Sequence, residues 1–116
     1  MFYVSATQLP FEQLSLNFEG ELYFDNSNQH QAIRKLYATD ASVYQELPIA
    51  VALPRTIQDI QKLILFATEH NVTLMPRAAG TSLAGQVVGN GIVVDISKYF
   101  DKILEINAPE RWVRVQ

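Results

Sequence analysis

The stretch from Pro76 to Gln86 holds the residues of this chain that are best suited to binding an anion. It reads PRAAGTSLAGQ, and four of the five glycines of the chain lie in it or shortly after it. Residues 78–94 carry no charged side chain, although 18% of the chain is charged. Small side chains, hydroxyl groups and accessible backbone N–H groups suit close contact with a polar ligand, and a phosphate-bearing cofactor is the natural candidate.

Two common nucleotide-binding motifs do not account for this stretch. Gly80 and Gly85 have the glycine spacing of a P-loop, but Gln86 and Val87 replace the lysine and the hydroxyl residue that a P-loop requires. The Rossmann fingerprint follows a strand and opens a helix, whereas the glycines of residues 89–91 precede an expected strand. Neutral donors would therefore do most of the binding.

The expected donors are the backbone N–H groups of residues 79–82, the hydroxyl groups of Thr81 and Ser82, and the start of a short helical stretch over residues 83–85. Arg77 has two interpretations, as a partner of phosphate or as a surface side chain that pairs with a neighbouring carboxylate. On composition and position alone, a connecting loop without a ligand is an equally open interpretation of the stretch.

A strand–helix–strand unit must position this stretch. The hydrophobic pattern predicts a strand over 49–53, a helix over 57–70, and further strands over 72–75 and 92–96. Thr56 and Asp59 have approximately the spacing of a capping box, Asn71 predicts the end of the helix, and Pro76 is expected to close the second strand. The strands of such a unit are parallel with a right-handed crossover, so the stretch would lie at the carboxyl edge of the sheet, where ligands bind.

The fold class is therefore α+β (α/β), with a βαβ unit in a small mixed sheet flanked by helices. The other expected elements are a helix over 11–18, a short strand or extended arm over 21–24, a helix over 29–38 capped by Asn28, and a hairpin of 103–106 with 112–116. The remaining polar and aromatic candidates have structural interpretations: local turns for Asp40, Ser42 and Asp95, and core or interface packing for Tyr37, Tyr44 and Trp112.

Composition and charge exclude several functions. A net charge of −3 with scattered Lys and Arg argues against nucleic acid as a partner. The absence of cysteine excludes thiolate metal sites within the chain, and His30 and His70 are far apart and belong to no ligand-spaced motif, so no metal is expected. The first residues lack the features of a signal peptide, and we expect a cytoplasmic location. Residues 112–116 have the pattern of a strand interior, which indicates part of a longer protein.

Taken together, Pro76 to Gln86, the glycine-rich turn that follows and residues 92–97 resemble the FAD-binding (PCMH-type) half of the p-cresol methylhydroxylase/vanillyl-alcohol oxidase superfamily. Within it, the chain is most similar to the FAD-linked oxidase branch, which includes a glycolate oxidase component and the D-lactate and D-2-hydroxyglutarate dehydrogenases. Residues 37–44, 48–51 and 102–106 also resemble that branch in order and spacing.

The resemblance implies an N-terminal arm over residues 1–35 and the first subdomain of the FAD-binding domain over 36–116. It implies that residues 77–82 wrap the FAD pyrophosphate and that Gly85 and Gln86 line the adjoining channel. The implied cofactor-binding residues are Pro76, Arg77, Ala78, Ala79, Gly80, Thr81, Ser82, Leu83, Gly85 and Gln86. Because the loop has no histidine where some members of the superfamily attach the flavin covalently, FAD should be non-covalent. Ala78 and Ala79 stand where relatives often have glycine, and a positive φ there would be strained.

The implied function is that of a flavin-dependent oxidase or dehydrogenase that oxidises a D-2-hydroxy acid such as lactate, glycolate or 2-hydroxyglutarate. This chain would bind and orient FAD, would be inactive alone, and would hold no catalytic residue, because the substrate domain is expected beyond Gln116. The implied partners are FAD and the hydroxy acid, with room for a dimer through an exposed strand edge and for peripheral membrane association of the whole enzyme. The alternative is a non-catalytic α/β module that binds another anion or a protein.

Overall fold

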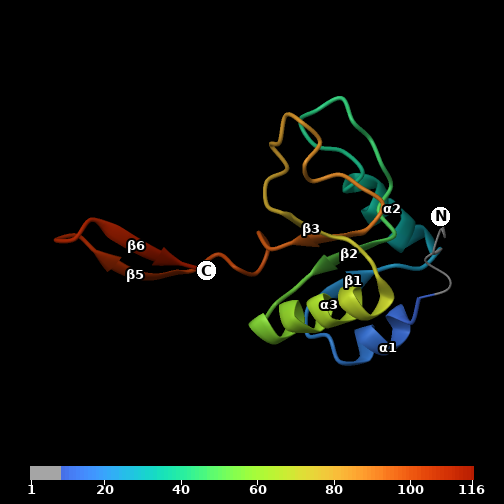
Figure 1. Cartoon of the computed structure of the whole chain (residues 1–116), viewed down its shortest axis with the longest axis horizontal. Coiled ribbons are helices and arrows are strands. Elements are labelled where there is room, and N and C mark those ends of the chain that lie inside the picture. Colours follow the sequence, from blue (N-terminus) through green and yellow to red (C-terminus); the bar gives the residue numbers. More distant parts are fainter. Residues whose placement is uncertain (1–8) are drawn as a thin grey trace.

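A computed structural model describes residues 9–116 (Figure 1). Its elements are α1 (Phe11–Leu16), β1 (Glu21–Tyr23), α2 (Asn28–Leu36), β2 (Ala50–Leu53), α3 (Ile57–His70), β3 (Leu74–Arg77), β4 (Ile92–Asp95), β5 (Ile103–Asn107) and β6 (Trp112–Val115). Four strands form a sheet in the order β1-β2-β4-β3, in which β2 and β3 pair parallel with β4 and β1 pairs antiparallel with β2. The predicted mixed sheet with its βαβ unit is confirmed.

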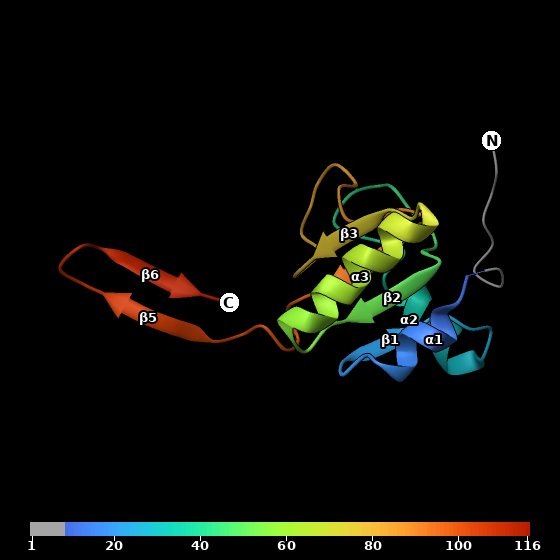
Figure 2. The same cartoon turned by 60° about the horizontal axis from the view of Figure 1, so that its bottom comes forward.

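The central strands β2 and β4 are buried on both faces because helices cover both sides of the sheet. In Figures 1 and 2, α1 and α3 lie side by side against one face. The core on that face consists of Phe11, Ala50, Ala52, Leu63, Phe66, Ile92 and Val94. The opposite face holds Val51, Leu53, Met75 and Val93, packed against Ile33 and Tyr37. This alternation is what a strand in the middle of a covered sheet requires.

Helix α3 begins and ends where the sequence predicts. The Oγ1 atom of Thr56 accepts the N–H of Asp59 at 3.1 Å, which caps the first turn. Asn71 ends the helix in the left-handed conformation, with φ of 53°. Within residues 9–116, no helix is both long and apolar enough to cross a bilayer.

The carboxylate of Asp59 also ties the N-terminal part of the chain to α3. This side chain is fully buried and accepts three backbone N–H groups, from Glu19 at 2.9 Å, Gly20 at 2.8 Å and Arg55 at 2.9 Å. Gly20 lies so close to β2 that a Cβ atom there would be 2.1 Å from the carbonyl oxygen of Leu53. The turn before β1 is therefore fixed against the start of α3.

Three local predictions are wrong. Pro76 does not close β3 but lies inside it, opposite Val94, and it is tolerated because β3 is an edge strand with no partner on its outer side. Residues 83–85 form bends and not a helical turn. The cap of α2 is Ser27, whose Oγ atom accepts the N–H of His30, and Asn28 is the first helical residue.

Strands β5 and β6 form a separate antiparallel hairpin, as predicted. It projects away from the four-stranded sheet in both overall views (Figures 1 and 2). Its large apolar side chains are mostly exposed: Ile103, Leu104, Ile106, Val113 and Val115. The hairpin therefore contributes little to the core described above.

Candidate functional site

The 76–86 segment starts in β3 and runs beyond its carboxyl end, as the sequence predicts. It lies beside a second connection, the 38–46 segment, which joins α2 to β2 (Figures 1 and 2). The N–H of Ala41 donates to the carbonyl of Gly80 at 3.1 Å, which links the two segments. The 38–46 segment is closed on itself by a bridge between Thr39 and Gln45. The site is thus built from two loops at one edge of the sheet.

Glycine is required at two positions of the 76–86 segment. Gly80 has φ of +68° and Gly85 has φ of +74°, in the left-handed region that favours glycine. Added Cβ atoms would lie 2.4 Å from Nη2 of Arg77 and 2.7 Å from the ring of Tyr44, respectively. Among residues 9–116, the non-glycine residues with positive φ lie outside this segment, so the strain considered for alanines 78 and 79 does not occur.

Backbone donors of the 76–86 segment remain available to a ligand. None of the hydrogen bonds described for residues 9–116 uses the N–H groups of Ala79, Gly80, Thr81 or Ser82 as donors. Consecutive N–H groups with a left-handed residue among them form a concave anion-binding surface. No charged side chain of residues 78–94 competes for these donors. The residues present therefore fit a pyrophosphate group.

The hydroxyl group of Ser82 closes the second half of the segment. Its Oγ atom accepts the N–H groups of Ala84 at 3.4 Å and of Gln86 at 3.2 Å, and it donates to Oε1 of Gln86. These bonds shape a compact turn from residue 82 to residue 86 in place of the predicted helical stretch. In this conformation Ser82 organises the loop that carries the free N–H groups.

Arg77 joins the two segments through a backbone acceptor. Its Nη1 atom donates to the carbonyl of Thr39 at 2.6 Å, and its guanidinium lies 5.2 Å from the centre of the Tyr37 ring. The hydroxyl of Tyr37 donates to Oδ2 of the buried Asp95 at 2.5 Å, and burial raises the pKa of Tyr37, so this hydroxyl stays neutral. Arg77 is therefore held by a backbone carbonyl and not by a carboxylate, and its positive charge lies beside the predicted anion site.

Asp40 occupies the 38–46 segment next to these contacts. Its Oδ1 atom accepts the N–H of Ser42 at 2.7 Å, which confirms the predicted local turn. Hydrogen bonding by Ser42 holds the pKa of Asp40 below its usual value against the opposing effect of burial, and Ser82 and the charge of Arg77 lower it further. Asp40 is therefore ionised at neutral pH.

The sequence did not predict that the 38–46 segment contacts the 76–86 segment and forms one side of the site. Thr39, Ala41 and Tyr44 contact Arg77, Gly80 and Gly85 across about forty positions of the chain, as the glycine and hydrogen-bond geometry shows. The available signal was the resemblance of residues 37–44 to the same enzyme branch as the loop itself.

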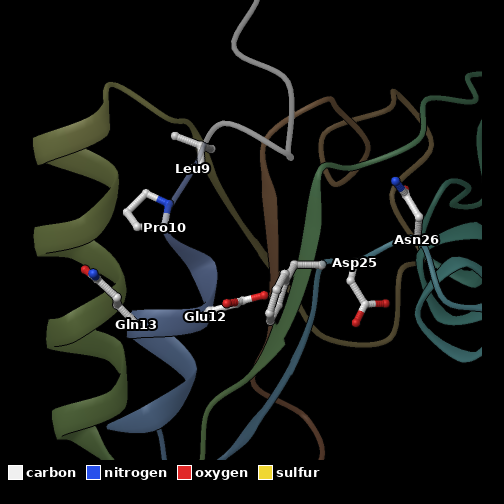
Figure 3. A pocket seen from close by; sticks show the side chains of 7 residues that line it. Leu9, Pro10, Glu12, Gln13, Asp25 and Asn26 are labelled. Atoms are coloured by element: carbon white, nitrogen blue, oxygen red, sulfur yellow. The ribbon is translucent and has the colours of Figure 1, made fainter.

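Two hollows of the surface formed by residues 9–116 lie away from the 76–86 segment. One, of about 460 Å³, opens between α1 and the segment after β1 and is lined by Leu9, Pro10, Glu12, Gln13, Phe24, Asp25 and Asn26 (Figure 3). Another, of about 550 Å³, lies between α1 and α3. Neither contains a residue of the 76–86 segment, so the predicted anion site is a loop surface outside these two hollows.

Comparison with known families identifies the cofactor of this chain. The model of the FAD binding domain family matches residues 48–116, which is more than half of the chain. The chain therefore belongs to the FAD binding domain family, and FAD is the cofactor that this membership assigns to it. The resemblance to the FAD-linked oxidase branch is confirmed.

The chain is similar to two groups of curated relatives. It is 41% identical over 103 residues to D-2-hydroxyglutarate dehydrogenase of Haemophilus influenzae, a match that covers 86% of this chain and 10% of that protein. It is 36% identical over 107 residues to glycolate oxidase subunit GlcD of Bacillus subtilis, covering 90% of this chain and 22% of that protein. The chain thus spans between a tenth and a quarter of the length of these relatives.

Solved structures share the fold. Alkyldihydroxyacetonephosphate synthase superposes with a TM-score of 0.72 at 17% identity, over 95% of this chain and 24% of that chain. The Physcomitrella patens BBE-like 1 protein superposes with a TM-score of 0.63 at 20% identity, over 84% of this chain and 21% of that chain.

Proposed function

We propose that the 76–86 segment binds the pyrophosphate of non-covalent FAD, within an enzyme that oxidises a D-2-hydroxy acid. The observation that carries the proposal is the run of four N–H donors, from Ala79 to Ser82, beyond the end of a parallel strand in a chain of the FAD binding domain family. The proposed cofactor-binding residues are Pro76, Arg77, Ala78, Ala79, Gly80, Thr81, Ser82, Leu83, Gly85 and Gln86.

The residues of this segment divide the work of binding. The N–H groups of residues 79–82 hydrogen-bond the phosphate oxygens, and Gly80 provides the left-handed turn that makes them converge. Arg77 supplies a nearby positive charge while its bond to Thr39 keeps it in place. Ser82 fixes the second half of the loop, because its Oγ atom accepts the N–H groups of Ala84 and Gln86.

The flavin supplies the redox chemistry when bound, because its isoalloxazine ring accepts a hydride from a substrate carbon. This chain binds and orients the cofactor, and we assign it no catalytic residue. The class of substrate is supported by the names of similar proteins, which are D-2-hydroxyglutarate dehydrogenases, a glycolate oxidase subunit and a D-lactate dehydrogenase. Lactate, glycolate and 2-hydroxyglutarate are therefore the proposed candidates.

The organisation of the whole protein is a further part of the proposal. The boundary between an arm over residues 1–35 and a FAD-binding subdomain over 36–116 stays a prediction, as does a cytoplasmic location. The exposed hairpin of β5 and β6 supports a dimer through its strand edge or peripheral contact with a membrane. Analytical ultracentrifugation and co-sedimentation with anionic lipid vesicles test these two associations.

The same hairpin is the one observation that favours an interaction module as the alternative function.

Two experiments test the proposed function. FAD is titrated into the whole protein and into this chain alone while flavin fluorescence is followed, and we expect saturable binding by the whole protein with weak or no retention by residues 1–116. The FAD-loaded protein is then mixed without oxygen with D- and L-lactate, glycolate and D- and L-2-hydroxyglutarate. Loss of the absorbance of oxidised flavin with a D-acid or glycolate supports the proposal. Absence of saturable FAD binding by the whole protein refutes it.

A further inference from the structure

The carboxylate of Asp40 is held against the 76–86 segment with one oxygen unused. Its Oδ1 atom accepts the N–H of Ser42 at 2.7 Å. Its Oδ2 atom is buried and has no hydrogen-bond partner among residues 9–116. Buried polar atoms are nearly always paired in native proteins, so an unpaired carboxylate oxygen beside a ligand site indicates a missing donor.

The backbone on both sides of Asp40 fixes the position of this oxygen. The carbonyl of Thr39 accepts Nη1 of Arg77 at 2.6 Å, and the N–H of Ala41 donates to the carbonyl of Gly80 at 3.1 Å. Residue 40 is therefore tied through both of its neighbours to the loop that presents the free N–H groups. An ionised carboxylate only accepts hydrogen bonds, so the missing partner must be a donor.

The donors that the loop brings near Asp40 are used elsewhere. Nη1 of Arg77 donates to the carbonyl of Thr39. The hydroxyl of Ser82 lies near enough to Asp40 to lower the pKa of its carboxyl, but a hydroxyl has one proton, which Ser82 donates to Oε1 of Gln86. A pyrophosphate group is anionic and offers acceptors, so it cannot fill the gap. In FAD, however, hydroxyl groups flank the pyrophosphate on both sides, on the ribityl chain and on the ribose of the adenosine.

We propose that Oδ2 of Asp40 accepts a hydrogen bond from a sugar hydroxyl of FAD, on the ribityl chain or on the ribose. The inference rests on the proposed function, because it assumes that the 76–86 segment holds the pyrophosphate. It gives a role to a residue that precedes the part matched by the family model, residues 48–116. The loop recognises the phosphates, and Asp40 distinguishes FAD from an inorganic anion.

The variant Asp40→Asn separates this role from a role in the turn. Its amide oxygen still accepts the N–H of Ser42, while an NH₂ group replaces Oδ2 and cannot accept a bond. In FAD titrations of the whole protein, we expect the Kd for FAD to rise about ten- to a hundredfold, the usual range for a lost hydrogen bond to a charged group. The affinity for inorganic pyrophosphate, measured by calorimetry, is expected to stay the same or increase.

Asp25→Asn is the matched control. Oδ1 of Asp25 accepts the N–H of Ser27 at 2.8 Å in the same kind of local turn, and Asp25 lies before α2, outside both loops of the site. This variant should leave the Kd for FAD unchanged. If Asp40→Asn also leaves it unchanged, Asp40 serves only the turn and the inference is wrong. Tighter binding of FAD by Asp40→Asn would also overturn it, because the carboxylate would then merely repel the phosphates.

A second measurement does not depend on how the variant folds. FAD analogues that lack a single hydroxyl, on the ribityl chain or on the ribose, are titrated into the unaltered protein. The analogue without the bound hydroxyl should bind at least about tenfold more weakly, which identifies the side of the pyrophosphate that Asp40 contacts. Equal affinities for all analogues overturn the inference while leaving FAD binding intact. Failure of the unaltered protein to bind FAD refutes the proposed function itself.

Discussion

Strand β4 and the β5–β6 hairpin are made of the same kinds of residue but lie in opposite environments. All four residues of β4 are buried, whereas every residue of β5 except the last is exposed. Val93 is 0% exposed and Val113 is 53% exposed. β4 lies between two parallel strands under helices on both faces, while β5 and β6 pair only with each other. Composition therefore predicts a strand, and position in the sheet decides its burial.

This difference matters for the site because the 76–86 segment is anchored in the buried half. It leaves β3 at Arg77, whose backbone lies opposite that of Asp95 in β4, and a packed sheet holds a loop end in one position. An isolated two-stranded hairpin is marginally stable at best. We therefore expect perturbations of the sheet to affect stability and FAD binding together, and perturbations of the hairpin to affect neither in this chain.

The largest contrast is expected from one substitution made in both regions. Val93→Ala removes two methyl groups from a close-packed site and should lower the free energy of unfolding by about 2 to 3 kcal/mol, from lost burial plus a cavity. Val113→Ala removes the same groups from an exposed strand and should change it by less than about 0.5 kcal/mol. Urea unfolding followed by circular dichroism measures both. Equal losses would contradict the description of the hairpin as uncovered.

The next contrast compares two acidic residues. Asp59→Asn should lower the free energy of unfolding by about 2 kcal/mol. An amide has one oxygen and no charge, so in either orientation its NH₂ group leaves at least one of the three backbone N–H groups without an acceptor. Glu105→Gln removes an exposed pair in which Oε2 of Glu105 lies 3.6 Å from Nη1 of Arg114, and should cost about 0.5 kcal/mol or less. The same unfolding experiment applies. A larger loss for Glu105→Gln would reverse the comparison.

The sequence alone was sufficient where local chemistry decides the structure. The cap at Thr56 and the stop at Asn71 give α3 its limits, and the side chains involved act within one turn of the helix. The wrong assignment of Pro76 has the opposite origin. A proline ends a strand when both sides of that strand are hydrogen-bonded to neighbours, and it is tolerated in an edge strand. β3 is an edge strand because β4 lies between β2 and β3 in the sheet.

The sequence predicts the 76–86 loop of the candidate site but not its contact with the 38–46 segment. The glycine positions and the absence of charge indicate an anion-binding loop from residue 76 to residue 86. The bonds from Arg77 to Thr39 and from Ala41 to Gly80 join residues nearly forty positions apart, and no periodicity encodes such a pairing. Likewise, the N–H groups of Glu19 and Gly20 reach the carboxylate of Asp59 across about forty positions of the chain.

The smallest contrast concerns pH. Glu21 of β1 accepts hydrogen bonds from Nζ of Lys98 at 2.7 Å and from the hydroxyl of Tyr99 at 2.6 Å, and these bonds lower its pKa from 4.5 to about 2. Because the folded pKa lies below the unfolded one, the carboxylate stabilises the fold above pH 4.5, and this contribution is lost as the pH falls towards 2. The side chain is 27% exposed, so screening by water limits the contribution to about 1 kcal/mol.

Unfolding of Glu21→Gln at about pH 6 and about pH 3 measures this contribution. The variant should be less stable than the unaltered chain at the higher pH by about 1 kcal/mol and should approach it at the lower pH. If the difference in the free energy of unfolding between Glu21→Gln and the unaltered chain is the same at both pH values, the charge of Glu21 does not contribute to stability.

A charge placed in the 76–86 segment tests whether this segment holds the FAD pyrophosphate. Thr81 is exposed within the run of free N–H groups, so Thr81→Glu sets a carboxylate beside the phosphates and Thr81→Gln is its neutral match. In FAD titrations of the whole protein, we expect Thr81→Glu to weaken binding about a hundredfold relative to Thr81→Gln, less so at high salt. Equal affinities for the two variants would show that the pyrophosphate binds elsewhere.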